Sequence, residues 1–406
     1  MRLKQTILNI YFLLPEPVKD TVWLKYLQVI KRKKYVRYNV VNVRDGISGG
    51  DIIFCPEKEK TYTYSKLPMY FDDANEKKKE VELPNRYVAR LFDVVIHGTY
   101  SFILSGTKCL DDIQYMFSSI QNIRSEEIVK NTKNHIWIRK WTKTEKIKRG
   151  ISLIGMGSDN LYHLTVEIVS RLLWIEQLNL YKDYSILLDE RVQMIPQYSQ
   201  LINVVNTLGR NVIEIKPEVN YEVEELVYAS PNTWIPFNVK KNFVCTSSFF
   251  LFSRESLLML KKTVLREEIC EEPFRKIYVS RKKLTNQRVE NEEQIEEMFK
   301  KRGFQIVYPE ELDYVKQVRI FNESKYVAGN SGAAMTNLIF CNEGSTYITF
   351  VDETNEMYLF PTIAKLLNLN CHLLPLKIIK RESSLANSHF KVDTGACEKY
   401  LNMFEE

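Results

Sequence analysis

At 406 residues the chain is too long for one ordinary domain and fits two, and its hydrophobic fraction of 45% excludes a chain that is disordered throughout. No stretch approaches the roughly 20 apolar residues that a membrane-spanning helix needs. The net charge of +6 is concentrated at one end, because residues 1–50 hold ten Lys and Arg against three acidic residues.

Seven cysteines are spread along the chain, and no two have the Cys-x-x-Cys spacing of a zinc or redox site. The odd number favours reduced thiols, which are typical of the cytosol. The apolar run over residues 7–14 lacks a small-residue cleavage site and soon meets two prolines, so we do not expect a secretory signal. We therefore expect a cytoplasmic protein, soluble or peripheral at the inner face of a membrane.

The basic segment, residues 1–50, also carries aromatic side chains such as Tyr11, Phe12 and Trp23. Basic and aromatic residues together suit an anionic membrane surface, and such a charge would also suit nucleic acid. A solvated basic face on an ordinary helix explains the same composition. We expect membrane-surface contact through this segment and no nucleic acid as a partner.

From residue 150 onward, short apolar runs alternate with amphipathic stretches. They predict strands over 151–155, 184–188 and 212–215, and helices over 160–178 and 198–208. This alternation is typical of a parallel sheet with crossover helices. Pro231 and Pro236 flank Trp234 and break the pattern, which predicts a linker between domains. Before residue 150 the pattern is less regular, although 35–43 and 88–96 could be strands that extend the first sheet.

A second alternating series follows. A helix over 253–269 has Ser253 as a candidate N-cap, and Gly303 would end a charged helix over 291–301. The other expected elements are strands over 276–279, 304–307, 326–328, 346–350 and near Leu373, and helices over 314–322, 333–340 and 357–367. Two α/β units in tandem predict two facing Rossmann-like domains with parallel sheets and a cleft between them. The expected boundaries are 1–235 and 236–385, with a polar tail over 386–406.

The turn Gly329-Asn330-Ser331-Gly332-Ala333-Ala334 is conspicuous in a chain with only 14 glycines. It follows a predicted strand and opens a predicted helix, where open α/β sheets bind ligands. Unpaired N–H groups and the helix dipole suit a phosphate there, and small side chains let a diphosphate approach the backbone. The turn has neither the G-x-G-x-x-G nor the P-loop pattern, which disfavours nicotinamide cofactors and ATP. A tight turn without a ligand also explains this motif when it is taken alone.

A second strand end brings positive charge to the same edge. The predicted strand over 276–279 runs into Ser280 and Arg281, where a guanidinium can bind phosphate oxygens. Arg288 is a candidate for the same anion or for a pairing role on the next helix. Lys282 and Lys283 are better explained as a solvated loop.

These residues resemble glycosyltransferase family 61, which includes capsular-polysaccharide enzymes, plant xylan-decorating enzymes and animal O-linked N-acetylglucosaminyltransferases. The resemblance rests on an ordered pattern over 277–340: Tyr278-Val279-Ser280-Arg281, Arg288, Asn291-Glu292, Gly303-Phe304, Pro309-Glu310, Gln317, Gly332-Ala333-Ala334 and Thr336-Asn337-Leu338. It covers the second half of the chain well and the first half at one helix. Family members usually have His where this chain has Ser331, so we expect phosphate contacts mainly from backbone amides and Arg281.

The resemblance implies a two-domain arrangement of the GT-B type, with a nucleotide sugar in the second domain. Tyr308 and Glu310 are expected near the uridine of a UDP-sugar, at the end of the strand before the turn. The expected donor-binding residues are Ser280, Arg281, Arg288, Tyr308, Glu310, Asn330, Ser331, Gly332, Ala333, Ala334 and Asn337.

The family pattern also covers the start of the helix over 160–178, where it implies acceptor-binding residues at Asp159, Asn160 and Tyr162. His163 and Glu167 are four residues apart, on one helix face. An inverting transfer needs a base for the acceptor hydroxyl, and we predict Glu167 as this base with His163 orienting it or the substrate. Two alternatives stay open: His163 as the base, and an exposed structural ion pair between Glu167 and Arg171.

The sequence contains neither Asp-x-Asp nor His-Glu-x-x-His, so we expect no metal and no cofactor. The predicted function is an inverting glycosyltransferase that moves xylose or N-acetylglucosamine from UDP to a glycan or glycolipid acceptor, in surface or capsular polysaccharide synthesis. The alternative is a non-catalytic protein that binds a nucleotide sugar and is recruited to membrane or nucleic acid by the basic segment.

Overall fold

The computed structural model describes residues 34–47, 50–72, 75–123, 125, 127–240, 243–266, 268–284, 288–352, 357–380 and 388–403, together with Val18, Thr21, Val22, Lys25 and Gln28. Most of the basic segment, with its predicted membrane contact, therefore lies outside the described residues. In the part that is described, no helix has the length and apolar character needed to cross a bilayer.

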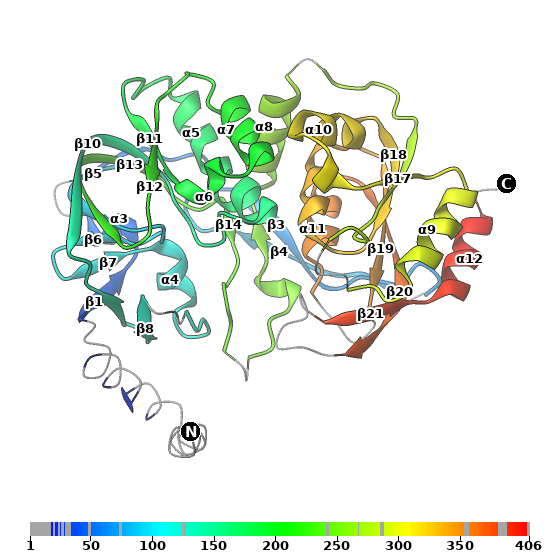
Figure 1. Cartoon of the computed structure of the whole chain (residues 1–406), viewed down its shortest axis with the longest axis horizontal. Coiled ribbons are helices and arrows are strands. Elements are labelled where there is room, and N and C mark those ends of the chain that lie inside the picture. The colour runs from blue at the N-terminus through cyan, green and yellow to red at the C-terminus, as the bar shows by residue number, and fades with distance from the viewer. Residues whose placement is uncertain are drawn as a thin grey trace.

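The first half is built on a large mixed sheet, on the left in Figure 1. Its four strands at one end are parallel to one another, and the next strand pairs antiparallel with them. In spatial order the strands are β12 (Val212–Ile215), β11 (Ser185–Asp189), β10 (Lys143–Leu153), β13 (Val219–Ala229), β5 (Val88–His97), β6 (Ile103–Ser105), β7 (Lys108–Leu110), β1 (Tyr35–Val41), β9 (His135–Arg139) and β8 (Ile128–Asn131), with β2 (Asp51–Phe54) beside β5.

The expectation of a parallel sheet is correct for β12, β11, β10 and β13 and wrong for most of the other pairs. A parallel connection needs a crossover of a dozen or more residues, whereas a short turn forces neighbouring strands to run in opposite directions. Only Gly106 and Thr107 separate β6 from β7, and Gly106 has the positive φ of 56° that such a tight hairpin favours. The strands expected over 35–43 and 88–96 are confirmed as β1 and β5.

The helix expected over 160–178 forms in two parts, a π-helix followed by an α-helix. The helix expected over 198–208 is also present, as α7, and several short helices accompany it. The helices of this half are α3 (Val43–Gly46), α4 (Asp112–Phe117), the π-helix η1 (His163–Val169), α5 (Ser170–Gln177), α6 (Glu190–Gln193) and α7 (Pro196–Val205).

The second half holds a parallel sheet, as predicted, with one antiparallel strand at its end. The strand order is β17 (Gln305–Val307), β16 (Arg275–Val279), β18 (Ser324–Gly329), β19 (Thr346–Val351), β20 (Asn370–Lys380) and β21 (His389–Val392). The helices are η2 (Ser247–Phe249), α8 (Arg254–Leu265), α9 (Glu292–Lys301), η3 (Pro309–Glu311), α10 (Tyr314–Asn322), η4 (Ala333–Phe340), α11 (Leu359–Leu366) and α12 (Thr394–Asn402). The Ser253 side chain caps α8 by accepting from the backbone N of Ser256, as expected.

The segment expected as a polar tail is folded instead. β21 pairs with β20, and α12 packs against α9 at the right of Figure 1. Cys397, Tyr400 and Leu401 recur at helical spacing and are buried in a cluster shared with the second sheet. This short apolar stripe among charged residues was too weak a pattern to predict a helix.

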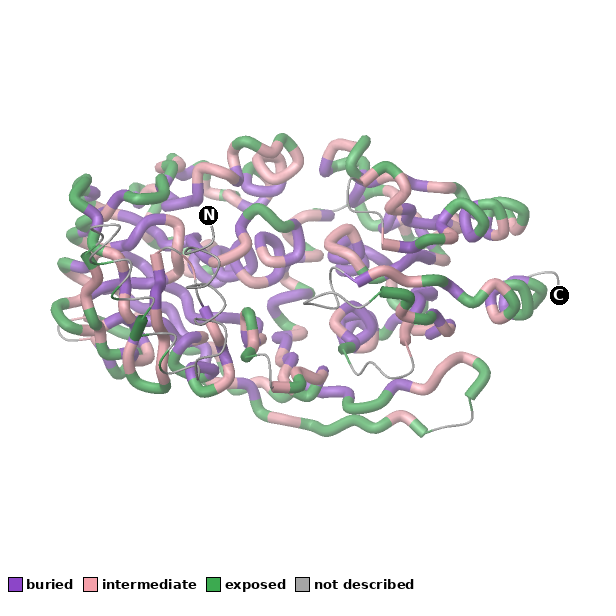
Figure 2. The backbone as a smooth tube through the Cα atoms, turned by 60° about the horizontal axis from the view of Figure 1, so that its bottom comes forward, coloured by how far each residue is buried: buried purple, intermediate pink, exposed green. Residues whose placement is uncertain are grey.

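The two halves share one apolar core, because α8 packs against α5 and α7, and α7 packs against α10. Figure 2 shows buried residues in the interior of both halves. The segment predicted as a linker packs against this core through Ile235, and its Trp234 is buried in a smaller cluster beside it. It forms β14 (Thr233–Trp234), which pairs with β15 (Leu251–Phe252). Asn232 is buried and accepts a hydrogen bond from Trp174 Nε1 at 2.9 Å. The domain boundaries stay a prediction.

A hairpin from the first half, β3 (Lys60–Lys66) and β4 (Lys77–Glu82), extends toward the second half (Figure 1). The backbone N of Tyr70, between its strands, donates to the carbonyl of Leu373 in β20 at 2.8 Å. Tyr64 packs with Tyr358 and Leu373 in a small buried cluster. The hairpin thus fastens the first half to the second.

A buried carboxylate beneath the first sheet makes stability depend on pH. Asp112 accepts from the backbone N of Val43 and from the hydroxyls of Tyr87 and Tyr228 at 2.8–2.9 Å. Burial raises the pKa of Asp112 to about 6, above the value of about 3.9 for an unfolded chain. The stability from this group is therefore complete below the unfolded pKa and lost as pH rises through 6.

We expect Asp112→Asn to remove this pH dependence. Between pH 4 and pH 8, the free energy of unfolding of the variant should gain about 2–3 kcal/mol relative to the wild type, since one pKa unit corresponds to about 1.4 kcal/mol. Urea unfolding at several pH values measures both curves. A difference that stays constant over this range would contradict the prediction.

Candidate active site

The π-helix η1 begins just after the carboxyl end of β10 and carries both predicted catalytic residues. The loop that joins β10 to η1 turns through Gly157, which has a φ of 77°. A Cβ at this position would lie 2.8 Å from Cδ2 of His163. Glycine therefore lets the loop pack directly against the His163 ring. Single π-helical turns are frequent at functional sites because they displace side chains from the regular α-helical positions.

His163 and Glu167 form a hydrogen-bonded pair on η1. Nδ1 of His163 lies 2.8 Å from Oε2 of Glu167, and both side chains are about one quarter exposed, at 25% and 24%. Burial lowers the pKa of His163, but the charge of Glu167, its hydrogen bond and the charge of Asp159 outweigh this effect and raise the pKa. Because this hydrogen bond uses Nδ1, the other ring nitrogen, Nε2, is available to contact a ligand.

The expected alternative of an exposed ion pair between Glu167 and Arg171 is wrong. Arg171 is buried and donates to the backbone carbonyl of Ile154 at 2.9 Å. Among the residues that the structure describes, the ion-pair partner of Glu167 is His163 instead. The Glu167 carboxylate is therefore paired with the His163 imidazole, a group that can exchange protons, and not with a permanently charged guanidinium.

Aromatic rings fix the orientation of the His163 imidazole. Tyr162 and Phe237 contact it edge to face, with ring centroids 5.1 and 5.6 Å away. Tyr162 also packs against Phe360 of α11. Burial, together with the charge of Glu167, raises the pKa of Tyr162, which keeps its hydroxyl protonated. The imidazole is therefore held in place by packing as well as by its hydrogen bond.

The turn over 329–334 connects β18 to η4 at the carboxyl edge of the second sheet, as predicted. The Arg281 guanidinium, at the end of neighbouring β16, lies against it so closely that a Cβ on Gly332 would collide with Nη1. Burial lowers the pKa of Arg281. Burial and the positive charge of Arg281 lower the pKa of Arg288 to about 10. Two partly buried guanidinium groups beside one turn are a candidate site for an anion, because an anion would offset their mutual repulsion.

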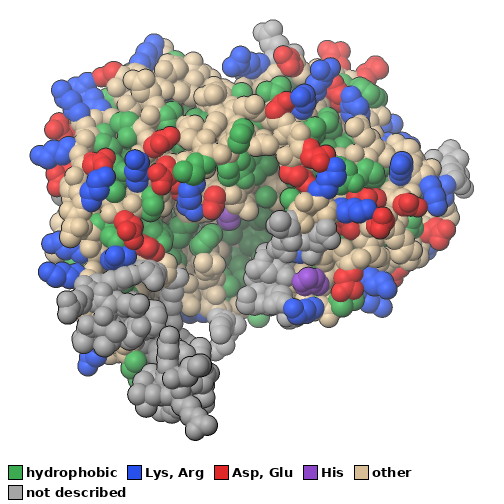
Figure 3. Space-filling model, viewed as in Figure 1, with side chains coloured by type: hydrophobic (Ala, Val, Ile, Leu, Met, Phe, Trp, Pro, Cys, Tyr) green, Lys and Arg blue, Asp and Glu red, His purple; other side chains and the backbone are tan. Residues whose placement is uncertain are grey.

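Two adjoining cavities meet at this turn, and both are bordered by Asn330, Gly332 and Ala333. The His163 cavity, of about 280 Å³, also contains Asn160, Tyr162, His163, Arg288 and Ser331 in its wall. The Arg281 cavity, of about 390 Å³, contains Ser280, Arg281, Glu310, Gln317 and Ala334. The space-filling view shows a hollow with apolar side chains near the middle of this face of the molecule (Figure 3).

Three of the predicted donor residues have side chains engaged elsewhere. The Ser280 hydroxyl donates to Glu296 at 2.5 Å, and Tyr308 donates to the same carboxylate at 3.2 Å. Asn337 is buried and donates to Gln317 at 3.1 Å. Through these hydrogen bonds to Glu296 and Gln317, the three side chains hold the segments around the Arg281 cavity in place.

The predicted acceptor residues do not form one site. Asn160 and Tyr162 border the His163 cavity, beside the donor turn. Asp159 instead forms an ion pair with Arg191 at 2.9 Å. Glu167 borders a separate cavity of about 70 Å³. The geometry thus brings His163, rather than Glu167, next to the turn.

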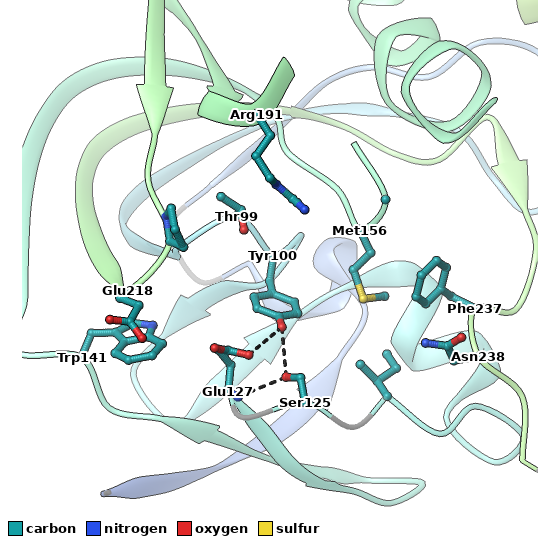
Figure 4. A pocket seen from close by; sticks show the side chains of 14 residues that line it. Thr99, Tyr100, Ser125, Glu127, Trp141, Met156, Arg191, Glu218, Phe237 and Asn238 are labelled. Carbon is teal, nitrogen blue, oxygen red and sulfur yellow. Dashed lines mark hydrogen bonds between the residues drawn. The ribbon is translucent and has the colours of Figure 1, made fainter. Parts of the chain in front are cut away.

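A third cavity, the Tyr100 cavity of about 450 Å³, was missed by the sequence analysis (Figure 4). Its wall includes Tyr100, Glu127, Trp141, Gly157, Arg191 and Phe237. These residues come from several loops and from α6, far apart in the chain, so no motif marks them. Because Gly157 and Phe237 both contact His163, this ring lies between the Tyr100 cavity and the His163 cavity.

No group of three or more His, Cys, Asp or Glu side chains is placed to hold a metal ion in the described part of the chain. The candidate anion site and the adjoining His–Glu pair have the chemistry that a group-transfer enzyme needs: the first suits a charged donor, and the second suits proton transfer.

Residues 161–348 match the family model Glycosyltransferase 61, and this segment includes the His163–Glu167 pair, Arg281 and the turn. This part of the chain belongs to the glycosyltransferase 61 family, which confirms the resemblance seen in the sequence. Membership implies a glycosyltransferase, with a sugar donor and an acceptor as substrates. A comparison with curated proteins found no matching relative.

Proposed function

We propose that the chain is an inverting glycosyltransferase of the GT-B type that transfers xylose or N-acetylglucosamine from UDP to a glycan acceptor without a metal ion. The observation that supports it best is the His163 cavity, in which His163, paired with Glu167, shares a wall with Arg288 and the turn over 329–334. In this proposal residues 1–235 hold the acceptor and residues 236–385 hold the donor.

The donor diphosphate would bind the backbone amides of the turn together with Arg281 and Arg288. Its nucleoside would occupy the Arg281 cavity near Glu310, and its sugar the His163 cavity. As the bond between the anomeric carbon and the phosphate oxygen breaks, its electron pair passes to UDP. The two guanidinium groups would neutralise the charge that develops there.

The acceptor hydroxyl would lose its proton to Nε2 of His163 while its oxygen attacks the anomeric carbon. Glu167 accepts the hydrogen bond from Nδ1 and would stabilise the imidazolium that forms. The position of each side chain relative to the turn favours this assignment over Glu167 as the base. We also propose a cytoplasmic location, with the basic segment at the membrane surface and a role in surface or capsular polysaccharide synthesis.

The test is turnover of a panel of UDP-sugars, with release of UDP as the readout. We expect hydrolysis or transfer with at least one member, and we expect the rate to persist in EDTA. Loss of the rate in EDTA and its recovery with Mn²⁺ would contradict the metal-independent step. Binding of UDP-sugars without any turnover would favour the alternative, a non-catalytic binding protein recruited to membrane or nucleic acid by its basic segment.

A further inference from the structure

The Tyr100 cavity has a polar floor built around one carboxylate (Figure 4). Tyr100 Oη donates to Oε2 of Glu127 at 3.0 Å and lies 3.0 Å from Oγ of Ser125. The backbone N of Glu127 donates to the same Ser125 oxygen at 3.1 Å. These contacts fix the Glu127 side chain while its second oxygen, Oε1, is not used by them. Such an oxygen can accept hydrogen bonds from the hydroxyls of a ligand.

The charges around this cavity leave Glu127 unbalanced. Arg191 is neutralised by the buried Asp189 at 2.6 Å and by Asp159. Glu218, which also lines the cavity, pairs with Arg139 at 3.3 Å. Within the described residues, no cation pairs with Glu127. Among the residues that the structure describes, the charge left at this cavity is therefore negative and would repel an anionic ligand.

The opposite side of the cavity is apolar and leads to the proposed base. Met156 and Phe237 line it together in Figure 4. Phe237 also packs against the His163 ring, and Gly157 separates the cavity from that ring by backbone alone. Carbohydrates present both hydroxyls and an apolar ring face, so this combination of a carboxylate and an aromatic ring suits a sugar. A volume of about 450 Å³ lies within the range of roughly 300–1,000 Å³ that is usual for ligand sites.

We propose that the Tyr100 cavity binds the acceptor and selects a neutral sugar at its reacting end, against sugars that carry a carboxylate or phosphate. The inference rests on the proposed glycosyltransferase function. Glu127 accepts hydrogen bonds from the acceptor hydroxyls, Phe237 packs against its ring, and a hydroxyl is thereby presented to His163. A negatively charged acceptor would pay the like-charge repulsion of Glu127 in a partly buried site.

The experiment compares matched neutral and anionic ligands by titration, with ligand-observed NMR on the full chain. The probes are p-nitrophenyl β-glucoside and p-nitrophenyl β-glucuronide, which differ only in the carboxylate at C6, and the corresponding galactoside and galacturonide. We expect the wild type to bind at least one neutral ligand about 10-fold more tightly than its anionic counterpart, as for loss of one charged contact. Glu127→Gln should reduce this preference, and Phe237→Ala should weaken binding of the neutral ligand.

Glu145→Gln is the matched control, because Glu145 is exposed on β10 and pairs with Lys143 outside the cavity. It should keep the wild-type preference. Thermal unfolding of each variant checks that the fold is retained. Equal binding of neutral and anionic ligands by the wild type, or a preference that survives Glu127→Gln in a folded protein, would overturn the proposal. UDP release from UDP-sugars is measured in parallel: its absence counts against the glycosyltransferase function, whereas normal release without sugar preference counts against this inference alone.

Discussion

His163→Gln is expected to lower kcat for sugar transfer by about 10²–10⁴-fold, the usual contribution of a general base. Gln keeps the size and part of the polarity of imidazole, but it cannot take a proton from the acceptor hydroxyl. The dissociation constant for UDP should change little, because the anion site consists of the turn and the arginines. Steady-state kinetics and calorimetry with UDP measure the two effects separately.

Glu167→Gln distinguishes the two possible bases through the pH profile. In the wild type, Glu167 raises the pKa of His163 against the effect of burial. If neutral His163 is the base, activity should rise with pH through this raised pKa, which lies above the ordinary value of about 6.5. Glu167→Gln removes the negative charge and leaves burial dominant, so this limb should move to lower pH while activity persists in reduced form. Complete loss of activity in Glu167→Gln, with substantial activity left in His163→Gln, would instead make Glu167 the base.

The fold was predictable where periodicity and turn length agree. Alternating strands and helices after residue 150 predict the parallel part of both sheets, and the Gly303 and Ser253 caps fall as expected. The first 140 residues were harder, because irregular strands joined by hairpins carry little periodic signal. The apolar residues of α12 are few and interspersed with charges, so that helix was missed as well.

The candidate site was predictable where backbone geometry concentrates chemistry at the end of a strand. Arg281 and the turn follow neighbouring strands, and His163 and Glu167 share a helix face, so the local sequence together with the family resemblance was enough to propose them. The direction in which each side chain points depends on tertiary packing. The Ser280 hydroxyl is occupied by Glu296, and Glu127 reaches the neighbourhood of His163 only through the arrangement of the antiparallel strands.

Arg281→Ala is expected to weaken UDP binding by about 10–100-fold, the cost of losing a hydrogen bond between charged groups at about 1.5–3 kcal/mol. The fold-decrease in kcat/KM should exceed the fold-decrease in UDP affinity, because charge on the leaving UDP grows as its bond to the anomeric carbon breaks. Arg281→Lys should recover only part of it, since an ammonium group cannot form the paired hydrogen bonds of a guanidinium. Lys282→Ala is the control: its side chain is exposed and pairs with Glu293, so its UDP affinity should match the wild type.

Gly332→Ala tests the same anion site without changing any charge. The added Cβ would collide with Nη1 of Arg281, so the guanidinium must leave its position against the turn or the turn must shift. Because Arg281 keeps its charge, a site that needs only nearby positive charge would tolerate the methyl group. A site that needs the guanidinium fixed against the turn should lose UDP affinity about as strongly as Arg281→Ala does. The loss of UDP affinity in the double variant should then be little larger than in either single variant, because both substitutions remove the same contact. Additive losses in calorimetric titrations with UDP would mean that the turn and Arg281 bind different parts of the donor.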